Sequence, residues 1–412
     1  MIIRRQFIAG LAVATGTLAA CQPSSTAQSS EKKTSRTTSR SAGTRLTQEM
    51  LEDALTGSSY LGCGGGGGLQ EARDLIAGDL ASGHIFKSIT VDELSDTDRV
   101  ACPYGLGSIA PGTEMSKTLD ALDDRIDEPV QAAFELLERH LETKFSGVIL
   151  GEIGPLSLAE GLSIAARLGV PALDADTVGR ATPEINQHSV RVAGYPLTPA
   201  AGATQFGDEV IVGKLGQPSR GEDIFRALSV ASGIIGVVDA PITGDIAKRK
   251  GTLVTGSLTL AMDIGRAVRE AKAAGIDPIE AARVAGDGYK LFEGRVGRSN
   301  WADGDGFLEG DVIVAGTGPY AGQSLHLDYK NEHLVAKRNG KTIATCPDLI
   351  TMIDKATADG INNPDFIEGQ EVAILGFRCD PLWRTEAGLE VFSPSYFGYD
   401  EDYVPIETRL GI

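Results

Sequence analysis

Residues 148–176 read VILGEIGPLSLAEGLSIAARLGVPALDAD, and their apolar pattern changes twice within this stretch. Residues 148–150 form a short apolar run that is typical of a buried strand. Residues 156–168 then carry apolar side chains at helical spacing, and residues 169–173 lead into a second strand. Two strands joined through a helix by short connections predict a right-handed crossover in a parallel sheet.

The residues that precede this unit continue the α/β arrangement. Apolar side chains at helical spacing or in alternation predict three further helices and two further strands there. We expect helices at 48–55, 69–81 and 130–141 and strands at 84–91 and 99–104. Residues 46–200 are therefore predicted to form an α/β domain with parallel strand–helix–strand units, a glycine-rich loop and an acidic cluster.

The character of the sequence changes after about residue 200. A strand is expected at 210–215 and helices at 222–231 and 257–274, and beyond Gly294 glycine- and acid-rich turns alternate with short apolar runs. We expect these runs to be strands, at 311–314, 324–329, 333–337, 342–344, 371–375 and 389–392. Residues 201–412 are therefore predicted to form a β-rich domain with inserted helices, and the fold class of the whole chain is α+β.

The first twenty residues have the pattern of an export signal. Arg4 and Arg5 precede an apolar stretch, Phe7 to Ala20, which is shorter than the roughly 20 residues that span a bilayer. The paired arginines resemble a twin-arginine signal, and Leu-Ala-Ala before Cys21 resembles a lipobox, in which the cysteine is lipidated. We expect residues 1–20 to be removed and the protein to be an exported bacterial lipoprotein, anchored to a membrane and facing the periplasm.

Residues 21–45 are predicted to be a flexible tether. Twelve of these twenty-five residues are Ser or Thr and almost none is large and apolar, so the segment cannot bury enough surface to order itself. In the whole chain, 56 acidic residues against 38 basic ones give a formal net charge of −18. This charge is a poor match to a polyphosphate backbone and excludes nucleic acid as the expected partner. A homo-oligomer is left open.

The run GCGGGGG at 62–68 has two interpretations. It contains the GxGxxG pattern, but it follows a predicted helix instead of a strand and lacks a Gly-Lys-Ser/Thr end, so neither nucleotide-binding motif is complete. The main-chain amides of Gly64, Gly65, Gly66 and Gly67 could bind an anionic group at a helix start. The alternative is a close-packed turn between two helices. Cys63 is then either a nucleophile with a lowered pKa or, as we favour, a small packing residue.

Three carboxylates are expected at one edge of the parallel sheet. Glu152 follows the first strand of the crossover, and Asp174 and Asp176 follow the second. Because the carboxyl ends of parallel strands share an edge, these groups are candidate catalytic residues that divide acid and base roles or bind a divalent metal ion. The alternative is helix capping and solvated turn acids. Arg180 follows in the same loop and is a candidate substrate-binding residue.

Polar residues also interrupt a strand-like run in the β-rich half. Asn331 and Glu332 lie within YKNEHL, where polar groups indicate either an edge strand, which we favour, or a binding site. The five histidines have no metal-binding spacing, although one of them could lie beside the aspartates. No metal ligand set can be assigned from the sequence.

Several motifs together resemble the S-methyl thiohydantoin desulfurase family. They occur in the family's order over most of residues 47–406, and they are LGCGGGG, GEIGPL, LDADTVGRATPE, NEHLVA, CPDLI, PLWRTEAG and FGYDEDYVP. The resemblance implies an N-terminal α/β domain, a C-terminal β-rich domain and hydrolytic release of methanethiol from a methylthio-imidazolone ring to give a hydantoin. The chain departs from the family at Cys63, where threonine is usual, and at Pro155-Leu156, where a glycine pair is frequent. Family members are also commonly soluble cytoplasmic proteins.

The leading hypothesis is therefore a hydrolase that acts on a small anionic nitrogen heterocycle bound between the two domains. Glu152, Asp174 or Asp176 would serve as base or metal ligand, and the glycine amides would hold a substrate carboxylate. A lipid-anchored binding protein that captures a small metabolite without catalysis is the alternative. A nucleotide-dependent enzyme of the oxoprolinase type rests on the glycine run alone.

Overall fold

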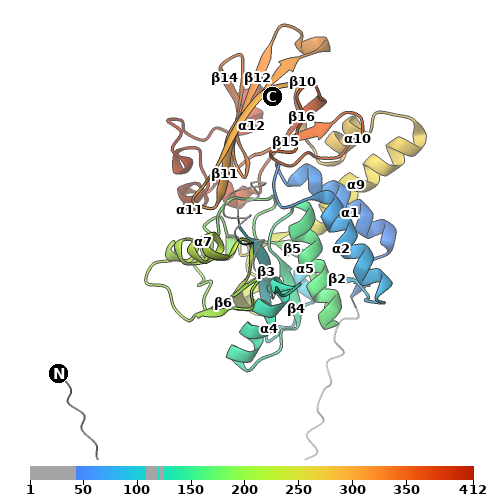
Figure 1. Ribbon diagram of the computed structural model, residues 1–412. Coiled ribbons are helices and arrows are strands. Elements are labelled where there is room, and N and C mark those ends of the chain that lie inside the picture. The colour runs from blue at the N-terminus through green and yellow to red at the C-terminus, as the bar shows by residue number, and fades with distance from the viewer. Residues whose placement is uncertain (1–42, 108–118, 120–124) are drawn as a thin grey trace, which may run out of the picture. The chain divides into compact units, whose positions relative to one another are not determined.

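The computed structural model describes residues 43–107, 119 and 125–412, and two β-sheets organise them (Figure 1). The predicted export signal, Cys21 and the tether up to residue 42 lie outside the described residues. Residues 44–45, which the tether was expected to include, instead form strand β1 (Thr44–Arg45) and pair with β2 (Lys87–Ile89). None of the helices within the described ranges has the length and apolar character needed to cross a membrane.

The first sheet contains the predicted crossover. Its strands follow the order β1-β2-β5-β4-β3-β8-β6-β7, and β9 pairs with β5. Strands β2, β5, β4 and β3 are parallel, whereas β8 runs antiparallel to β3. The bounds are β3 Arg99–Leu106, β4 Gly147–Leu150, β5 Ala172–Asp176, β6 Ala200–Thr204, β7 Glu209–Val212, β8 Ile235–Thr243 and β9 Val254–Thr255.

Helix α5 (Pro155–Leu168) connects β4 to β5, which confirms the expected strand–helix–strand unit. Its start and end have clear local causes. Pro155 occupies the first turn, where its missing N–H costs nothing, and Gly169 ends the helix with a φ of 71° that favours glycine. Residues 148–150 are apolar throughout because both faces of the sheet are covered: Val148 and Leu150 join one core and Ile149 the other.

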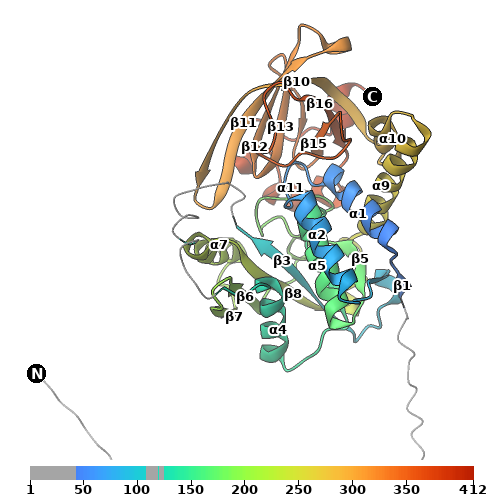
Figure 2. The ribbon, with the colours of Figure 1, turned by 45° about the vertical axis from the view of Figure 1, so that its right-hand side comes forward.

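Helices cover the first sheet, and Figure 2 shows α5 and α4 against its strands. Helix α1 packs on α9, and α2 packs on α5. The bounds are α1 Gln48–Leu61, α2 Leu69–Ala81, α4 Pro129–Leu141, α6 Ser189–Val192, α7 Arg220–Ser232, α8 Gly244–Ala247, α9 Ser257–Ala274 and α10 Pro278–Ala285, with a short 3-10 helix η1 at Val91–Glu93.

The second sheet is antiparallel, in the order β14-β13-β12-β11-β10-β16-β15, and it confirms the β-rich C-terminal region. Its strands are β10 Tyr289–Gly304, β11 Phe307–Gly316, β12 Ser324–Lys330, β13 Glu332–Arg338, β14 Lys341–Thr345, β15 Leu349–Asp354 and β16 Glu371–Phe377. The remaining helices of this part are η2 Gly318–Tyr320, η3 Pro381–Arg384, α11 Glu386–Val391, η4 Ser395–Phe397 and α12 Ile406–Leu410. The α+β fold class is therefore confirmed.

Two local expectations differ from the structure. The strand expected at 389–392 is largely helix α11, because the Thr385 side chain accepts a hydrogen bond from the Gly388 N–H and caps a helix there. The expected domain boundary at residue 200 does not coincide with the change of sheet, since β6 to β9 all join the first sheet. The apolar run 235–243, for which no strand was predicted, forms strand β8 between β3 and β6.

Candidate active site

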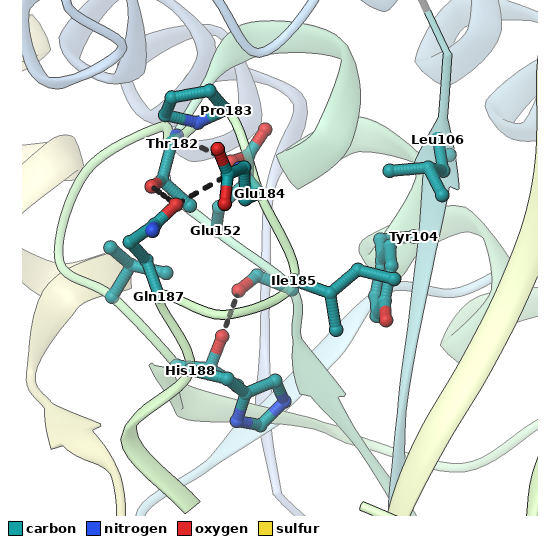
Figure 3. A pocket seen from close by; sticks show the side chains of 13 residues that line it. Tyr104, Leu106, Glu152, Thr182, Pro183, Glu184, Ile185, Gln187 and His188 are labelled. Carbon is teal, nitrogen blue, oxygen red and sulfur yellow. Dashed lines mark hydrogen bonds between the residues drawn. The ribbon is translucent and has the colours of Figure 1, made fainter. Parts of the chain in front are cut away.

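A cavity of about 60 Å³ lies where β3, β4 and β5 end. One water needs roughly 10–15 Å³ on this scale, so the cavity holds a group of a few heavy atoms. Glu152, Thr182 and Gln187 lie on one side of it, and Tyr104 and Leu106 on the other (Figure 3). All the lining residues lie between residues 104 and 188, so this cavity belongs to the first domain and not to the space between the two domains.

Glu152 is held in the cavity wall by two hydrogen bonds. Its Oε1 accepts from the Ser157 hydroxyl at 2.8 Å, and its Oε2 accepts from the Thr182 N–H at 2.8 Å. Burial raises the pKa of Glu152 to about 7, although both hydrogen bonds and the charge of Arg180 act in the opposite direction. This carboxyl group can therefore accept or donate a proton near neutral pH.

Asp176 ends strand β5 and is fully buried. Its Oδ2 accepts the main-chain N–H groups of Val178 and Gly179, at 2.9 and 2.6 Å. Burial raises the pKa of Asp176 to about 7 against these hydrogen bonds, and the negative charge of Glu152 raises it further. The structure thus brings Glu152 and Asp176 into one electrostatic neighbourhood, as expected from their places after parallel strands.

Asp174 does not join them. Its Oδ1 accepts the Thr259 N–H at 3.0 Å and its Oδ2 accepts the Thr259 hydroxyl at 2.6 Å, so it caps the first turn of α9. It lines a different, larger hollow of about 890 Å³ together with Lys248 and Arg249. The prediction that three carboxylates meet is therefore wrong for Asp174. Its contacts instead fit the alternative, in which it caps a helix.

Three buried side chains that the sequence analysis did not select lie together beside the cavity. They are Cys102 on β3, His188 before α6 and Asp239 on β8, and one ligand-type atom of each lies within 4.8 Å of the others. The distance from His188 Nε2 to Asp239 Oδ1 is 3.3 Å. Tyr104, also on β3, donates its hydroxyl proton to Asp239 Oδ2 at 2.7 Å.

An irregularity between β3 and β8 sets this arrangement. Val100 pairs with Ile242 and Cys102 pairs with Asp239, so β8 carries one more residue than β3 over this interval. The extra residue on β8 gives a β-bulge, in which Ala240 adopts a left-handed φ of 46°. Cys102 thereby lies opposite Asp239. The signal in the sequence was a polar residue within each of two apolar runs, but nothing in the sequence indicated that the two strands pair.

The thiol of Cys102 is linked electrostatically to the cavity acids. Burial raises its pKa well above the usual range, and the charges of Asp239, Asp176 and Glu152 raise it further. The three-residue cluster, Glu152 and Asp176 therefore lie close enough to affect one another electrostatically.

The glycine-rich loop between α1 and α2 is filled by protein atoms. A Cβ on Gly65 would lie 1.8 Å from Glu332 Oε1, one on Gly66 would lie 2.4 Å from the Gly154 Cα, and one on Gly67 would lie 2.4 Å from the Leu156 Cβ. Gly66 and Gly67 also adopt φ values of 73° and 78°, which favour glycine. The close-packed turn explains these glycines, together with Gly64, without a bound anion.

The remaining predicted residues join this loop to the second sheet. Arg180 is fully buried and donates to the main-chain carbonyls of Asp348 and His333, at 2.8 and 3.1 Å. Asn331 accepts the Leu308 N–H at 2.8 Å through its Oδ1. The edge interpretation is wrong for Glu332, because β13 lies between β12 and β14, and Asn331 lies between strands β12 and β13 with a left-handed φ of 54°.

Two buried groups at the loop have raised pKa values. Burial raises the pKa of Glu332 well above its usual range, and the charge of Glu152 raises it further. Burial raises the pKa of Cys63 to about 11, which disfavours a nucleophilic thiolate and fits a packing residue.

Comparison with known proteins gives matches over most of the chain. The N-terminal domain of S-Me-THD-like proteins matches residues 49–214, and the C-terminal domain of S-Me-THD-like proteins matches residues 217–406. Among solved structures, the X-ray crystal structure of a protein from Chromobacterium violaceum has a TM-score of 0.70 and 24% sequence identity, and the match covers 88% of this chain and 99% of that chain. This likeness shows a shared fold. No curated protein matches the chain.

Proposed function

Because the chain belongs to the S-Me-THD-like family, with both family domains present, we propose that it is a hydrolase acting on an S-methyl thiohydantoin ring. The single observation that carries the proposal is a pair of electrostatically linked buried carboxyl groups, Glu152 in the cavity wall and Asp176 next to the lining residue Thr177, whose pKa values are both raised to about 7. At neutral pH one of them can be ionised while the other is protonated, which supplies a general base and a general acid together.

The reaction uses both forms. The ionised carboxylate accepts a proton as water attacks the ring carbon that carries the methylthio group, and a C–O bond forms. The C–S bond then breaks, and the protonated carboxyl group donates its proton to the departing methanethiolate. Water and the methylthio-imidazolone thus give a hydantoin and methanethiol, and each carboxyl group can return to its starting state by exchange with solvent.

The charges around the cavity favour a neutral ring at the reacting end. Lys330 pairs with Glu184 at 2.7 Å, and Arg180 donates to main-chain carbonyls, so both nearby cations already have partners. A carboxylate beside Glu152 and Asp176 would be repelled by whichever of these groups is ionised. We therefore modify the expected anionic heterocycle: its ring enters the cavity uncharged, and any anionic group extends away from it.

Turnover of 2-methylthio-imidazol-4-one by the purified protein tests this function, with released methanethiol as the readout. We expect E152Q and D176N each to lower kcat by about 10²–10⁴-fold, which is the usual contribution of a general acid or base. D174N is the matched control and should keep wild-type turnover, because Asp174 caps α9. Undiminished turnover in both E152Q and D176N contradicts the proposal. An unchanged ligand that raises the melting temperature would instead identify a binding protein.

We also propose that the mature protein works at a membrane surface as an exported lipoprotein. Support comes from the paired arginines Arg4 and Arg5 and from the lipobox ending at Cys21. Expression of the full chain in a bacterium with twin-arginine export, followed by fractionation, tests this. Wild type should partition with membranes and C21S should not, whereas C63S serves as a cysteine control. Equal membrane partitioning of wild type and C21S would contradict the lipid anchor.

A further inference from the structure

The Cys102, His188 and Asp239 side chains converge, and one polar atom on His188 and one on Asp239 face each other without a hydrogen bond within the described residues. All three are buried, with exposed fractions of 0%, 3% and 2%. Neither His188 Nε2 nor Asp239 Oδ1 has a hydrogen-bond partner within the described residues, although the two atoms lie only 3.3 Å apart. Their approach thus lacks hydrogen-bond geometry. Buried polar atoms without partners are rare and costly, so they point to a missing ligand.

We propose that these three side chains bind one divalent metal ion of the Zn²⁺ type. A tetrahedral ion about 2.0 Å from a nitrogen and an oxygen ligand holds those two atoms about 3.3 Å apart. This is the distance between His188 Nε2 and Asp239 Oδ1. The Cys102 sulfur completes a set whose atoms lie within 4.8 Å of one another. A thiolate with an imidazole selects zinc-like ions over Mg²⁺ or Ca²⁺.

The residues around the cluster support the same assignment. Tyr104 donates to Asp239 Oδ2, which orients this carboxylate and leaves Oδ1 directed at the cluster. The fold supplies three protein ligands, and one of them, His188, also lines the cavity. Three protein ligands, with a fourth position left for water or substrate, are typical of catalytic rather than structural zinc sites.

A Cys–His–Asp proton relay explains the arrangement of Cys102, His188 and Asp239 less well than a bound metal ion does. Such a relay needs the carboxylate on one ring nitrogen and the thiol on the other. In this structure the Val190 N–H donates to His188 Nδ1 at 3.3 Å, which leaves Nε2 to face Asp239. A metal bound at Nε2 places the ring proton on Nδ1, so this long contact with Val190 must open when the ion binds.

Binding is expected to depend on pH. Thiolate and imidazole ligands bind a metal ion in their deprotonated forms, so the affinity for the ion should rise with pH. This inference rests on the ligand geometry and does not require the proposed hydrolase function.

Metal content and Co²⁺ spectroscopy test the site. The full chain, purified without chelator and then loaded with Zn²⁺, should retain about one ion per chain, whereas C102S and D239N should bind at least about tenfold more weakly. Co²⁺ in place of Zn²⁺ should give a thiolate charge-transfer band in the near ultraviolet. C102S should lose this band and C63S, the matched buried-cysteine control, should keep it.

The outcomes separate this site from the proposed function. Circular dichroism of each variant shows whether it is folded, and H188Q gives a second variant if C102S does not fold. A Co²⁺ band that survives in C102S, or a wild type that holds no more Zn²⁺ than D239N, overturns the site. Metal binding without thiohydantoin turnover keeps the site and removes the function. Thiohydantoin turnover by a metal-free wild type that cannot be loaded with Zn²⁺ keeps the function and removes the metal site.

Discussion

The cavity and the glycine-rich loop both contain buried carboxyl groups, but their surroundings differ. At the loop, Glu332 fills the space beside Gly65, and other protein atoms fill the space beside Gly66 and Gly67. At the cavity, Glu152 faces about 60 Å³ of open volume. A buried acid packed against glycine contributes to the joint between the two sheets, whereas a buried acid that faces open volume can act on a ligand. Glycine content alone therefore does not identify a binding site.

The largest expected effect distinguishes the two carboxyl groups Glu152 and Glu332. E152Q removes an acid whose pKa is about 7 and should lower kcat by about 10²-fold or more. Burial raises the pKa of Glu332 and so favours its protonated form, which E332Q resembles, and Glu332 does not line the cavity, so kcat should stay within about threefold of wild type. Steady-state methanethiol release measures both. A larger kcat loss in E332Q than in E152Q would contradict the assignment of Glu152 as the acting group and Glu332 as a packing group.

The next effect concerns the packing of the loop. A Cβ at Gly66 would lie 2.4 Å from the main chain of Gly154 and require a φ of 73°. G66A should therefore lower the free energy of unfolding by about 3 kcal/mol or more. Gly83 is the control: its φ is 83°, but no atom lies within 4 Å of its Cβ position, so G83A should cost about 1 kcal/mol. If urea unfolding shows that G66A and G83A lose equal free energy of unfolding, the packing explanation is contradicted.

The pH dependence of stability is a third test, and its sign follows from Asp176. The folded protein keeps the Asp176 proton up to about pH 7, whereas the unfolded chain loses it near pH 4. Raising the pH through this window therefore lowers the free energy of unfolding, by at most about 1.4 kcal/mol per pH unit for this group. D176N should flatten this slope, and D174N should not. Urea titrations from about pH 4.5 to 7 measure it; an unchanged slope in D176N contradicts a raised pKa.

The smallest expected effect concerns the cap of α9. D174A removes the acceptor for the Thr259 N–H and hydroxyl and should lower the free energy of unfolding by about 1 kcal/mol. Turnover should be unchanged, because Asp174 lies on the other hollow. A loss of kcat in D174A, with stability preserved, would return Asp174 to the active site.

Much of the fold could be predicted from local patterns. The β4–α5–β5 unit follows from an apolar run, a Pro start and a Gly end, all within residues 147–176. Strand β8 was not predicted, although residues 235–243 are almost entirely apolar. Length and flanking residues did not separate such a run from a buried helix segment. That omission also left Asp239 out of the predicted site.

The site was predicted only in part, for the same reason. Glu152 and Asp176 could be placed together because the ends of adjacent parallel strands share an edge. Asp174, two residues from Asp176, has its partner in α9, and no local pattern indicates that contact. Cys102 lies beside Asp239 only because β3 pairs with β8 through a bulge.

The amino-acid sequence by itself was sufficient for the crossover unit, the two kinds of domain and the family, because apolar periodicity and short motifs are local properties of a chain. Which acids face open volume, which glycines are filled and which thiol meets which imidazole depended on tertiary structure. These contacts join segments far apart in the chain, and strand pairing, register and a single extra residue in β8 determine the distances between them. Their chemistry follows from burial, which only the packed molecule imposes.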